Sequence, residues 1–372
     1  MNYKDCNYKN CIFVNLDYIY SNIRYLEEKT KLKAIPVIKS DGYGLGSKET
    51  GKFLEHKGYN LFAVASIEEA LELRESGIKS EILILSGTPD DSIKLIVKNN
   101  FIPVLHSFEQ YKSWKRDIPE NFKIHIKFNT GMNRLGFNTN ENIDNILNDK
   151  RLIISGIMTH YAKADSNRRF TLNQLIKFKQ LLKKYNINQN KTIIHTSNSA
   201  SVINNYGVYG NYFRPGIFIY GGRPNTKMRQ NPNQKIPYHW VAKIIAMRNI
   251  HKGDKISYGG TYIADKNMKI GIIGIGYGDG LPRSLSNRGF FLFNNEKLNI
   301  IGRVCMDMTI VDMTNLSQIK VGEFVTVMGN SNKNIIYADD IAKINKTISY
   351  EILTGITKRT KRIYSANDKH NK

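Results

Sequence analysis

The chain has 372 residues, of which 41% are hydrophobic and 23% are charged. This length suits one large domain with a smaller one, and the composition is typical of a soluble globular protein with a substantial core. The formal net charge of +23 comes from Lys and Arg scattered along the whole length, without the clustered basic face that a nucleic-acid-binding protein usually needs. Biased codon usage would give the same scatter, whereas a basic field around a pocket would favour anionic ligands.

The cysteines and the apolar runs predict a cytoplasmic protein. Cys6, Cys11 and Cys305 cannot all pair within the chain, so we expect reduced thiols. Cys6 and Cys11 lack a second Cys/His pair, so no metal site is predicted. The N-terminus has no apolar core of a signal peptide, and no run approaches the roughly 20 apolar residues that span a bilayer. We therefore expect no membrane partner.

The first elements in chain order are a strand, Ile12–Leu16, and a helix, Tyr18–Glu28, with Asp17 as its expected N-cap. From Cys11 to about Ile236, short apolar runs then alternate with stretches of helical period. The predicted helices include Ile67–Glu75, Asp91–Lys98 and Thr171–Tyr185. The apolar runs are Ile35–Lys39, Phe62–Ser66, Ile82–Ser86, Pro103–Ser107, Ile124–Phe128, Ile154–His160, Ile193–Ser197 and Phe213–Tyr220. Eight strands alternating with helices predict a closed (β/α)8 barrel, because each parallel strand is then buried on both sides.

After Ile236 the apolar runs are separated by turns, with little helix between them. The runs are Val241–Met247, Ile270–Ile275, Asn299–Val304 and Phe324–Val327. They predict a mostly antiparallel β domain with a late helix near Ser349–Thr357. We therefore predict an α/β chain with a TIM-like (β/α)8 barrel in residues 1–236 and a mostly-β domain in residues 237–372. Residues 1–16 could pair with the β domain.

Lys39 ends the first apolar run and is followed at once by a glycine-rich turn that carries Tyr43. A lysine at the end of a buried parallel strand points into the cavity above the sheet, where partial loss of water favours the neutral, nucleophilic amine. A surface lysine that closes a strand is the commoner case for any lone lysine. Matching features at other strand ends favour the functional interpretation of Lys39.

Other polar residues follow the later strands of the predicted barrel, where catalytic residues of such barrels lie. They are Lys127, Asn129, Thr130, Gly131, Met132, Arg134, His160, Asn198 and Ser199, while Arg214 opens the eighth predicted strand. The Ser199 hydroxyl and the backbone N–H groups around Gly216 and Ile217 suit a phosphate. A phosphate anchor opposite a strand-end lysine predicts a pyridoxal phosphate site.

Several blocks of the chain, in order, resemble the alanine racemase family, whose members are fold-type III pyridoxal phosphate enzymes. The resemblance covers nearly the whole sequence. The blocks are Val14–Asp17, Val37–Gly44, Lys127–Gly136, Asn198–Ala200, Arg214–Gly216, Ser257–Gly259, Gly276–Gly280, Gly302–Asp307 and Arg362–Tyr364. This sequence departs from the family at Asn129, where an aspartate is common, and at Leu45, where a histidine is frequent.

The resemblance implies a two-base racemase that interconverts L- and D-alanine and supplies D-alanine for peptidoglycan. Lys39 would hold the cofactor as a Schiff base and act as one base at Cα, with Tyr258 as the other base on the opposite face. Arg214 would donate to the pyridine nitrogen with His160 as its neighbour. A permanent positive charge there would limit how far the ring drains the carbanion, which favours reprotonation over side reactions.

The resemblance also implies the remaining site residues and the assembly. Phosphate contacts would come from Tyr43, Ser199, Gly216, Ile217 and Tyr364, with Asn198 beside them; Arg134 would meet the ring hydroxyl and the substrate, positioned by Lys127, which is often carbamylated in the family. Met306 would bind the substrate carboxylate next to Asp307, and Asp165, Tyr277 and Arg283 would line the entrance. The family forms homodimers whose active sites are shared between subunits.

Three alternatives remain at this point. An enzyme of the same fold could be a decarboxylase or a racemase for serine or lysine, although Arg214 argues against a decarboxylase. A pyridoxal phosphate carrier would resemble the barrel alone, and Tyr258 in a second domain speaks against it. A nucleic-acid-binding protein is the alternative that rests on composition only.

Overall fold

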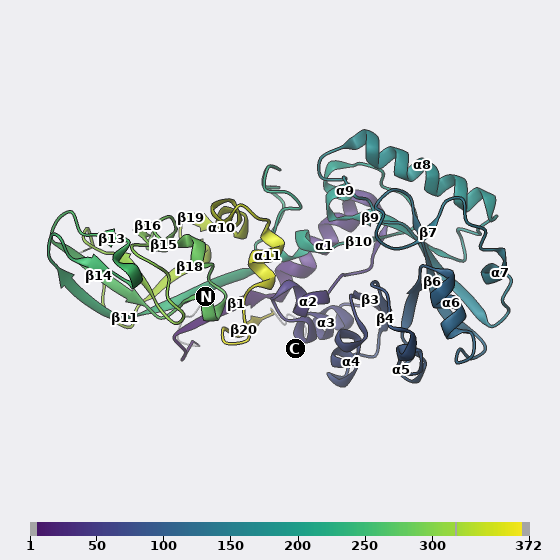
Figure 1. Cartoon of the computed structure of the whole chain (residues 1–372), viewed down its shortest axis with the longest axis horizontal. Helices are drawn as coiled ribbons and strands as arrows, with labels where there is room; N and C mark the ends of the chain where they lie inside the picture. The colour runs from purple at the N-terminus through teal and green to yellow at the C-terminus, as the bar shows by residue number, and fades with distance from the viewer. Residues whose placement is uncertain (1–5, 317, 367–372) are drawn as a thin grey trace, which may run out of the picture. The chain divides into compact units, whose positions relative to one another are not determined.

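The computed structural model describes residues 6–316 and 318–366 and divides into two compact units. One unit is Tyr20–Ile219, and the other combines Met1–Ile19 with Tyr220–Lys372. The N-terminal strand therefore folds with the C-terminal part of the chain. Figure 1 shows this strand, β1 (Asn10–Asn15), beside the long green strand β11 (Tyr238–Ile250), with which it pairs antiparallel.

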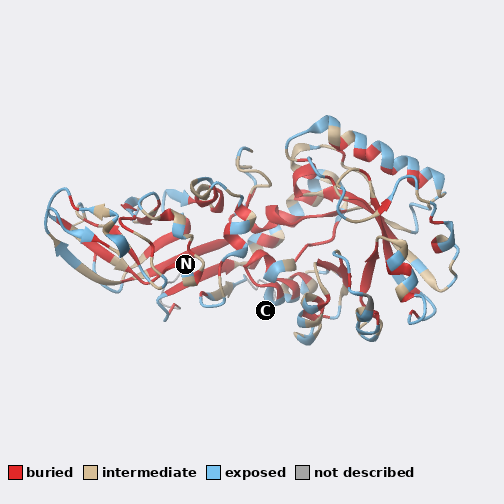
Figure 2. Ribbon diagram, in the orientation of Figure 1, coloured by how far each residue is buried: buried red, intermediate tan, exposed pale blue. Residues whose placement is uncertain are grey.

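The unit Tyr20–Ile219 is built on parallel strands that are buried along most of their length (Figure 2). Among the described residues, eight of them follow one another in the order β2-β10-β9-β8-β6-β5-β4-β3. A parallel bridge between Val37 and Ala63 joins the segment after β2 to β3, so the sheet closes into a barrel. The strands are β2 (Lys33–Ala34), β3 (Leu61–Val64), β4 (Glu81–Ile84), β5 (Ile102–Leu105), β6 (Phe122–Asn129), β8 (Leu152–Met158), β9 (Ile193–Asn198) and β10 (Tyr212–Arg214), and the short β7 (Phe137–Asn138) pairs with β6.

Helices connect the barrel strands because their apolar faces cover the sheet from outside. The helix predicted at Ile67–Glu75 is α4 (Ile67–Glu75), and Ser66 caps it by accepting a hydrogen bond from Glu69 N. The others are α1 (Leu16–Thr30), α2 (Lys39–Tyr43), α3 (Ser47–His56), η2 (Asp90–Ser92), α5 (Ile93–Lys98), α6 (Phe108–Trp114), α7 (Asp144–Leu147), α8 (Arg168–Lys184), α9 (Ser199–Asn204) and η3 (Ile217–Tyr220). The predicted (β/α)8 architecture is confirmed.

The other unit is mostly β, as predicted, and its main sheet runs β16-β15-β18-β11-β1-β20. Its strands beyond β1 and β11 are β12 (Lys255–Ile256), β13 (Tyr262–Ile263), β14 (Met268–Ile273), β15 (Phe290–Phe293), β16 (Glu296–Asn299), β17 (Thr309–Asp312), β18 (Phe324–Ser331), β19 (Asn334–Ile336) and β20 (Lys361–Ser365). Its helical elements are η4 (Tyr258–Gly260), η5 (Tyr277–Asp279), η6 (Arg283–Leu285), α10 (Ala338–Asn345) and α11 (Ser349–Thr354). The strand β1 lies between β11 and β20 and pairs with β20 in parallel.

Four local predictions were wrong. The run Ile35–Lys39 is not a continuous strand: β2 covers Lys33–Ala34, Val37 makes an isolated bridge to Ala63, and Lys39 begins α2. The run Phe213–Tyr220 is a three-residue strand followed by the 3-10 turn η3, since Pro215 removes a ladder donor and Gly216 follows it. Only Asn299 of the run Asn299–Val304 belongs to a strand, and Ile300 makes an isolated bridge to Val311. The cap of α1 is Asn15, which accepts a hydrogen bond from Tyr18 N at 3.0 Å, and not Asp17.

The expectation of three reduced thiols is also corrected. The structure joins Cys6 to Cys11 in a disulfide, and Cys305 is free. The number of cysteines, three, required only that at least one of them stay outside any disulfide within the chain. The pairing depends on the chain before β1 turning back, which brings the two Cα atoms to 6.2 Å, within the usual span of a disulfide.

None of the helices in residues 6–316 and 318–366 combines the length and the apolar character required to cross a membrane.

Candidate active site

Lys39 is the first residue of α2 and lies two residues after Val37, whose bridge to Ala63 closes the barrel. The turn that follows is left-handed: φ is 51° at Ser40, 51° at Asp41, 59° at Gly42 and 54° at Tyr43. Non-glycine residues rarely adopt this conformation, which costs about 1–2 kcal/mol per residue. Strain of this kind persists only where the surroundings hold the backbone in place, and it clusters at functional sites.

Two carboxylates hold this turn. Glu69 on α4 accepts hydrogen bonds from Ser40 N and Ala65 N, both at 2.7 Å, and Asp41 accepts one from Ser47 N at 3.0 Å. Glu69 thus joins the turn after Lys39 to the end of β3. Glu69 was not predicted from the sequence, because nothing local distinguishes it from the neighbouring acidic residues of the helix.

Several basic side chains lie close together at the mouth of the barrel. Burial lowers the pKa of Lys39, the charge of Arg134 lowers it further, and Glu69 opposes both effects. Burial together with the charges of Arg134, Arg214 and Lys39 lowers the pKa of Lys127 to about 8. Lysines in such surroundings lose their protons more easily than free lysine, and the cluster as a whole favours an anionic ligand. No group of three or more His, Cys, Asp or Glu side chains in the described parts of the chain could hold a metal ion.

Arg214, at the end of β10, is 3% exposed and is held almost entirely by neutral acceptors. Its Nη1 donates to His195 O at 2.6 Å and to His195 Nδ1 at 2.7 Å. Its Nη2 donates to Thr159 O at 2.8 Å, to His160 Nδ1 at 3.1 Å and to Thr196 O at 3.2 Å. Both terminal nitrogens are therefore saturated, whereas Nε–H has no acceptor among the described residues.

The charge on this guanidinium persists at neutral pH. Burial lowers the pKa of Arg214 to about 9, which still leaves it protonated. Burial and the Arg214 charge hold the pKa of His160 and of His195 well below the usual value, so both imidazoles are neutral. His195 was not predicted from the sequence, because it lies inside the run Ile193–Ser197 rather than at its end.

Tyr43, Ser199 and Gly216 meet at one point beside this arginine. The Ser199 hydroxyl oxygen accepts a hydrogen bond from Gly216 N at 3.0 Å. A Cβ built on Gly216 would overlap the Tyr43 hydroxyl oxygen, so any larger residue there would displace the Tyr43 side chain. Two hydroxyls and a bare stretch of backbone form a cradle for a small anion, with buried Ile217 next to it. The Asn198 side chain is engaged in capping α9, where it accepts from Ser201 N at 3.0 Å.

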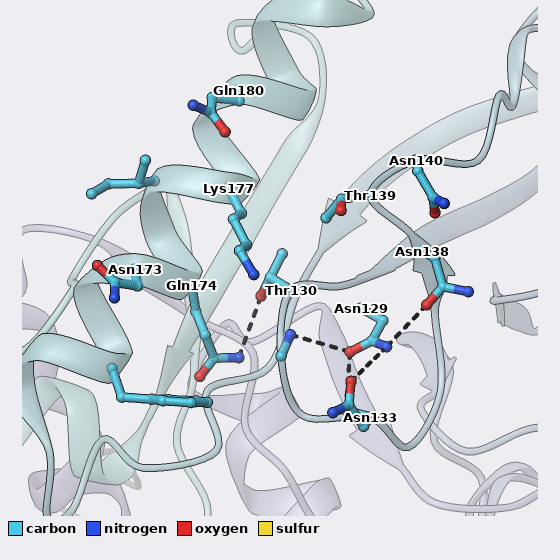
Figure 3. A pocket seen from close by; sticks show the side chains of 13 residues that line it. Asn129, Thr130, Asn133, Asn138, Thr139, Asn140, Asn173, Gln174, Lys177 and Gln180 are labelled. Atoms are coloured by element: carbon cyan, nitrogen blue, oxygen red, sulfur yellow. Dashed lines mark hydrogen bonds between the residues drawn. The ribbon is translucent and has the colours of Figure 1, made fainter.

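The loop that carries Arg134 is tied down by amide side chains (Figure 3). Asn129 Oδ1 accepts from Gly131 N at 3.2 Å and from Asn133 N at 3.0 Å, and Asn129 Nδ2 donates to Asn133 Oδ1 and Asn138 Oδ1. Gln174 of α8 donates to Thr130 Oγ1 at 3.3 Å. These groups border a pocket of about 840 Å³ whose lining does not include Lys39. Arg134 itself is exposed.

The predicted residues of the other unit form an exposed group. Exposed fractions are 73% for Tyr258, 41% for Tyr277 and 51% for Met306. Backbone hydrogen bonds join the last two segments, from Tyr277 N to Cys305 O at 3.0 Å and from Gly278 N to Met306 O at 2.9 Å. The hydroxyl of Ser257, the neighbour of Tyr258, bonds Arg303 O at 2.7 Å and so joins the same group.

The remaining predicted residues lie at separate places. Arg283 is exposed on η6, and Asp307 makes an ion pair with Arg359 at 2.6 Å. Tyr364 lies on β20. Asp165, in the barrel unit, accepts a hydrogen bond from Ser166 Oγ at 3.1 Å. The structure thus brings together the barrel residues around Lys39 and Arg214, and separately the exposed residues around Tyr258.

Known proteins match this chain over almost its whole length. Residues 14–224 match the sequence model "Alanine racemase, N-terminal domain", and residues 238–364 match "Alanine racemase, C-terminal domain". The alanine racemase of Aquifex aeolicus is 36% identical over 354 residues, which are 94% of this chain and 97% of the relative.

Solved structures of alanine racemases are also similar to this chain over almost its whole length. The alanine racemase from Bacillus anthracis with bound L-Ala-P superposes with a TM-score of 0.88 at 29% identity, covering 97% of this chain and 96% of the other. The alanine racemase from Bartonella henselae with covalently bound pyridoxal phosphate gives a TM-score of 0.86 at 29% identity, covering 96% of this chain and 100% of the other.

Proposed function

Because the chain belongs to the alanine racemase family, we propose that it interconverts L- and D-alanine with pyridoxal phosphate as its cofactor. The D-alanine would serve peptidoglycan synthesis. The observation that carries the proposal is the barrel mouth, where Lys39 and a charged Arg214 with one unused N–H face a site for a small anion.

The residues present fit pyridoxal phosphate. The free Nε–H of Arg214 suits the ring nitrogen, because an arginine can only donate and this nitrogen would then accept. Tyr43, Ser199, Gly216 and Ile217 suit the phosphate, and Lys39 is the amine that would hold the aldehyde carbon. The cluster of Lys39, Lys127, Arg134 and Arg214 balances the negative charges of the cofactor and of a substrate carboxylate.

When bound, the cofactor withdraws electrons from Cα of the amino acid and so makes its proton removable. Lys39 would move that proton on one face of Cα and Tyr258 on the other. Two groups are needed, since inversion removes a proton from one side and returns one to the opposite side. The lowered pKa of Lys39 favours this role, because at a given pH more of its amine is neutral and able to accept a proton than in an ordinary lysine.

Arg214 would set the reaction outcome through its charge. A guanidinium beside the ring nitrogen keeps that nitrogen unprotonated, whereas a carboxylate would favour its protonation. By keeping that nitrogen unprotonated, Arg214 would limit the electron withdrawal that the cofactor supplies, and so would favour return of the proton to Cα by Lys39 or Tyr258 over transamination or elimination. For the same reason a decarboxylase is the weaker alternative.

Arg134 and Met306 are the groups we propose for the substrate carboxylate. Met306 N–H has no acceptor among the described residues, and the side chain is half exposed. Arg134 is held within electrostatic reach of Lys39 by the Asn129 loop. We also propose supporting roles, or positions at the site entrance, for the remaining predicted residues, which are Lys127, Asp165, Tyr277, Arg283 and Asp307.

We propose a homodimer in which Tyr258 and Met306 of one subunit complete the barrel site of the other. Support comes from the exposure of Tyr258, Tyr277, Met306 and Met308, which is unusual for a cluster of large apolar side chains. The cytoplasmic location expected from the sequence stays a prediction that cell fractionation can test.

The test of the function is incubation of the purified protein with L-alanine and pyridoxal phosphate in D2O. We expect loss of optical rotation together with deuterium at Cα, and absorption near the visible–ultraviolet border that borohydride traps on Lys39. Release of CO2 would instead indicate a decarboxylase, and a protein that binds the cofactor without deuterating alanine would be a carrier. Serine offered in parallel tests specificity.

A further inference from the structure

A pair of buried histidines lies behind Arg214 inside the barrel. His195 on β9 and His125 on β6 are both 0% exposed. Arg214 Nη1 lies 2.7 Å from His195 Nδ1, and His195 Nε2 lies 2.9 Å from His125 Nδ1. These contacts form one chain of hydrogen bonds from the guanidinium to the centre of the barrel.

The direction of this chain follows by elimination. A guanidinium has only N–H donors, so His195 Nδ1 must accept and the His195 proton must sit on Nε2. His195 Nε2–H then donates to His125 Nδ1, which places the His125 proton on its own Nε2. Protonation of either ring would put two donors face to face next to a buried cation. Burial also lowers the pKa of His125 to about 3, in keeping with a neutral ring.

Gly156 on β8 makes this contact possible. The strand β8 lies between β6 and β9, and Gly156 pairs in register with His125. A Cβ built on Gly156 would overlap the His125 ring. The ring therefore reaches across the middle strand through the space that the glycine leaves.

The last group in this series of hydrogen bonds, His125 Nε2–H, lowers the stability of the folded protein. His125 Nε2 is buried and has no hydrogen-bond partner among the described residues. A buried donor without a partner destabilises a protein, whereas an apolar pair of similar size would not. Stability therefore does not explain the two histidines at this place. They are explained if His125 fixes which nitrogen of His195 carries the proton.

We propose that His125 and His195 are positioning residues: they orient the Arg214 guanidinium so that Nε–H alone is left for the cofactor ring nitrogen. This rests on the proposed function, in which Arg214 meets that nitrogen. His195 acts on the arginine, and His125 acts by fixing which nitrogen of His195 carries the proton.

The first test is ¹⁵N NMR of the histidine side chains in the full-length protein freed of cofactor, with signals assigned through His125→Asn and His195→Asn. We expect His125 and His195 as neutral rings protonated on Nε2 at neutral pH. A proton on His195 Nδ1, or a charged ring at either position, would overturn the proposal. This readout does not depend on racemase activity, so it separates the proposal from the function on which it rests.

The second test compares His125→Leu with His125→Asn. Leucine removes the acceptor for His195 Nε2–H, whereas the Asn side-chain oxygen can stand near the place of Nδ1. We expect His125→Leu to weaken binding of pyridoxal phosphate about tenfold, the equivalent of one hydrogen bond to a charged group. The melting temperature should barely move, because one unpartnered buried N–H replaces another. His125→Asn should keep the affinity and the His195 proton on Nε2.

Gly156→Ala is an independent variant, since it displaces the His125 ring without changing its chemistry. We expect it to resemble His125→Leu in affinity and in the His195 spectrum. His239→Asn, which alters a buried imidazole of the other unit, is the matched control for a general effect of losing a histidine. Equal affinities for His125→Leu and His125→Asn, or losses that only track melting temperature, would show a structural role and overturn the proposal.

Discussion

The surroundings of Arg214 and of Tyr258 are built in opposite ways. Arg214 is 3% exposed, and both of its terminal nitrogens are saturated by neutral acceptors from its own barrel. Tyr258 is 73% exposed, on a short 3-10 turn that ends in two glycines. The barrel unit therefore fixes its proposed cofactor groups by itself, before any ligand arrives. The other unit presents its proposed base on the surface, as expected for a group that acts on a second subunit.

The largest effect on activity is expected from a substitution in the barrel unit, at Lys39. Lys39→Ala should abolish racemisation, because no other amine stands at the end of the first barrel segment, while circular dichroism shows a folded protein. Trapping with borohydride should also fail. Lys48→Ala, at an exposed position on α3, is the control and should keep activity. A Lys39→Ala protein that still racemises alanine would contradict the assignment.

A subunit-mixing experiment tests whether the exposed Tyr258 acts on a second subunit. Homodimers of Lys39→Ala and of Tyr258→Phe should each be inactive. In a mixed dimer with shared sites, one site lacks both groups and the other is intact, so activity should return to about half of the wild-type value. The measurement is racemase activity after verified subunit exchange. If exchange restores nothing, Tyr258 serves its own chain and the proposed sharing of sites is wrong.

A smaller effect is expected from Gly216→Ala. The added methyl group would overlap the Tyr43 hydroxyl, so the cradle for the phosphate must open. We expect weaker binding of pyridoxal phosphate by about tenfold, as for loss of one hydrogen bond to a charged group, measured by equilibrium dialysis. Gly58→Ala is the matched control for a glycine with open space around it, although its positive φ adds some strain there. Unchanged affinity would place the phosphate elsewhere.

The smallest effect concerns pH. Glu69 raises the pKa of Lys39, and Arg134 lowers it. Glu69→Gln should therefore lower this pKa, so that the neutral amine forms at lower pH and cofactor capture by the freed protein speeds up towards the acidic side. Arg134→Gln should shift the pH profile of capture in the opposite direction. Shifts with the same sign in both variants would contradict the charge balance described for Lys39.

Much of the fold could be predicted from the sequence. Several buried parallel strands are short apolar runs, as at Phe62–Ser66, and the predicted bounds of α4 agree with the structure to the residue. Prediction failed where tertiary contacts override local pattern. Pro215 and Gly216 interrupt the run Phe213–Tyr220, and Asn15 rather than Asp17 reaches the free N–H groups of α1.

For the site, the sequence by itself determined which residues stand at strand ends and, through the resemblance, which family and chemistry they belong to. Lys39, Arg214, Ser199 and Tyr258 were predicted in this way, and their roles stay predictions. Only the tertiary structure decided how Arg214 is held. His195, His125 and Gly156 lie on three different strands, and their contacts run sideways across the barrel between residues far apart in the sequence. A single sequence does not encode such lateral contacts as a local pattern, because they depend on strand register and on the space that one missing side chain leaves.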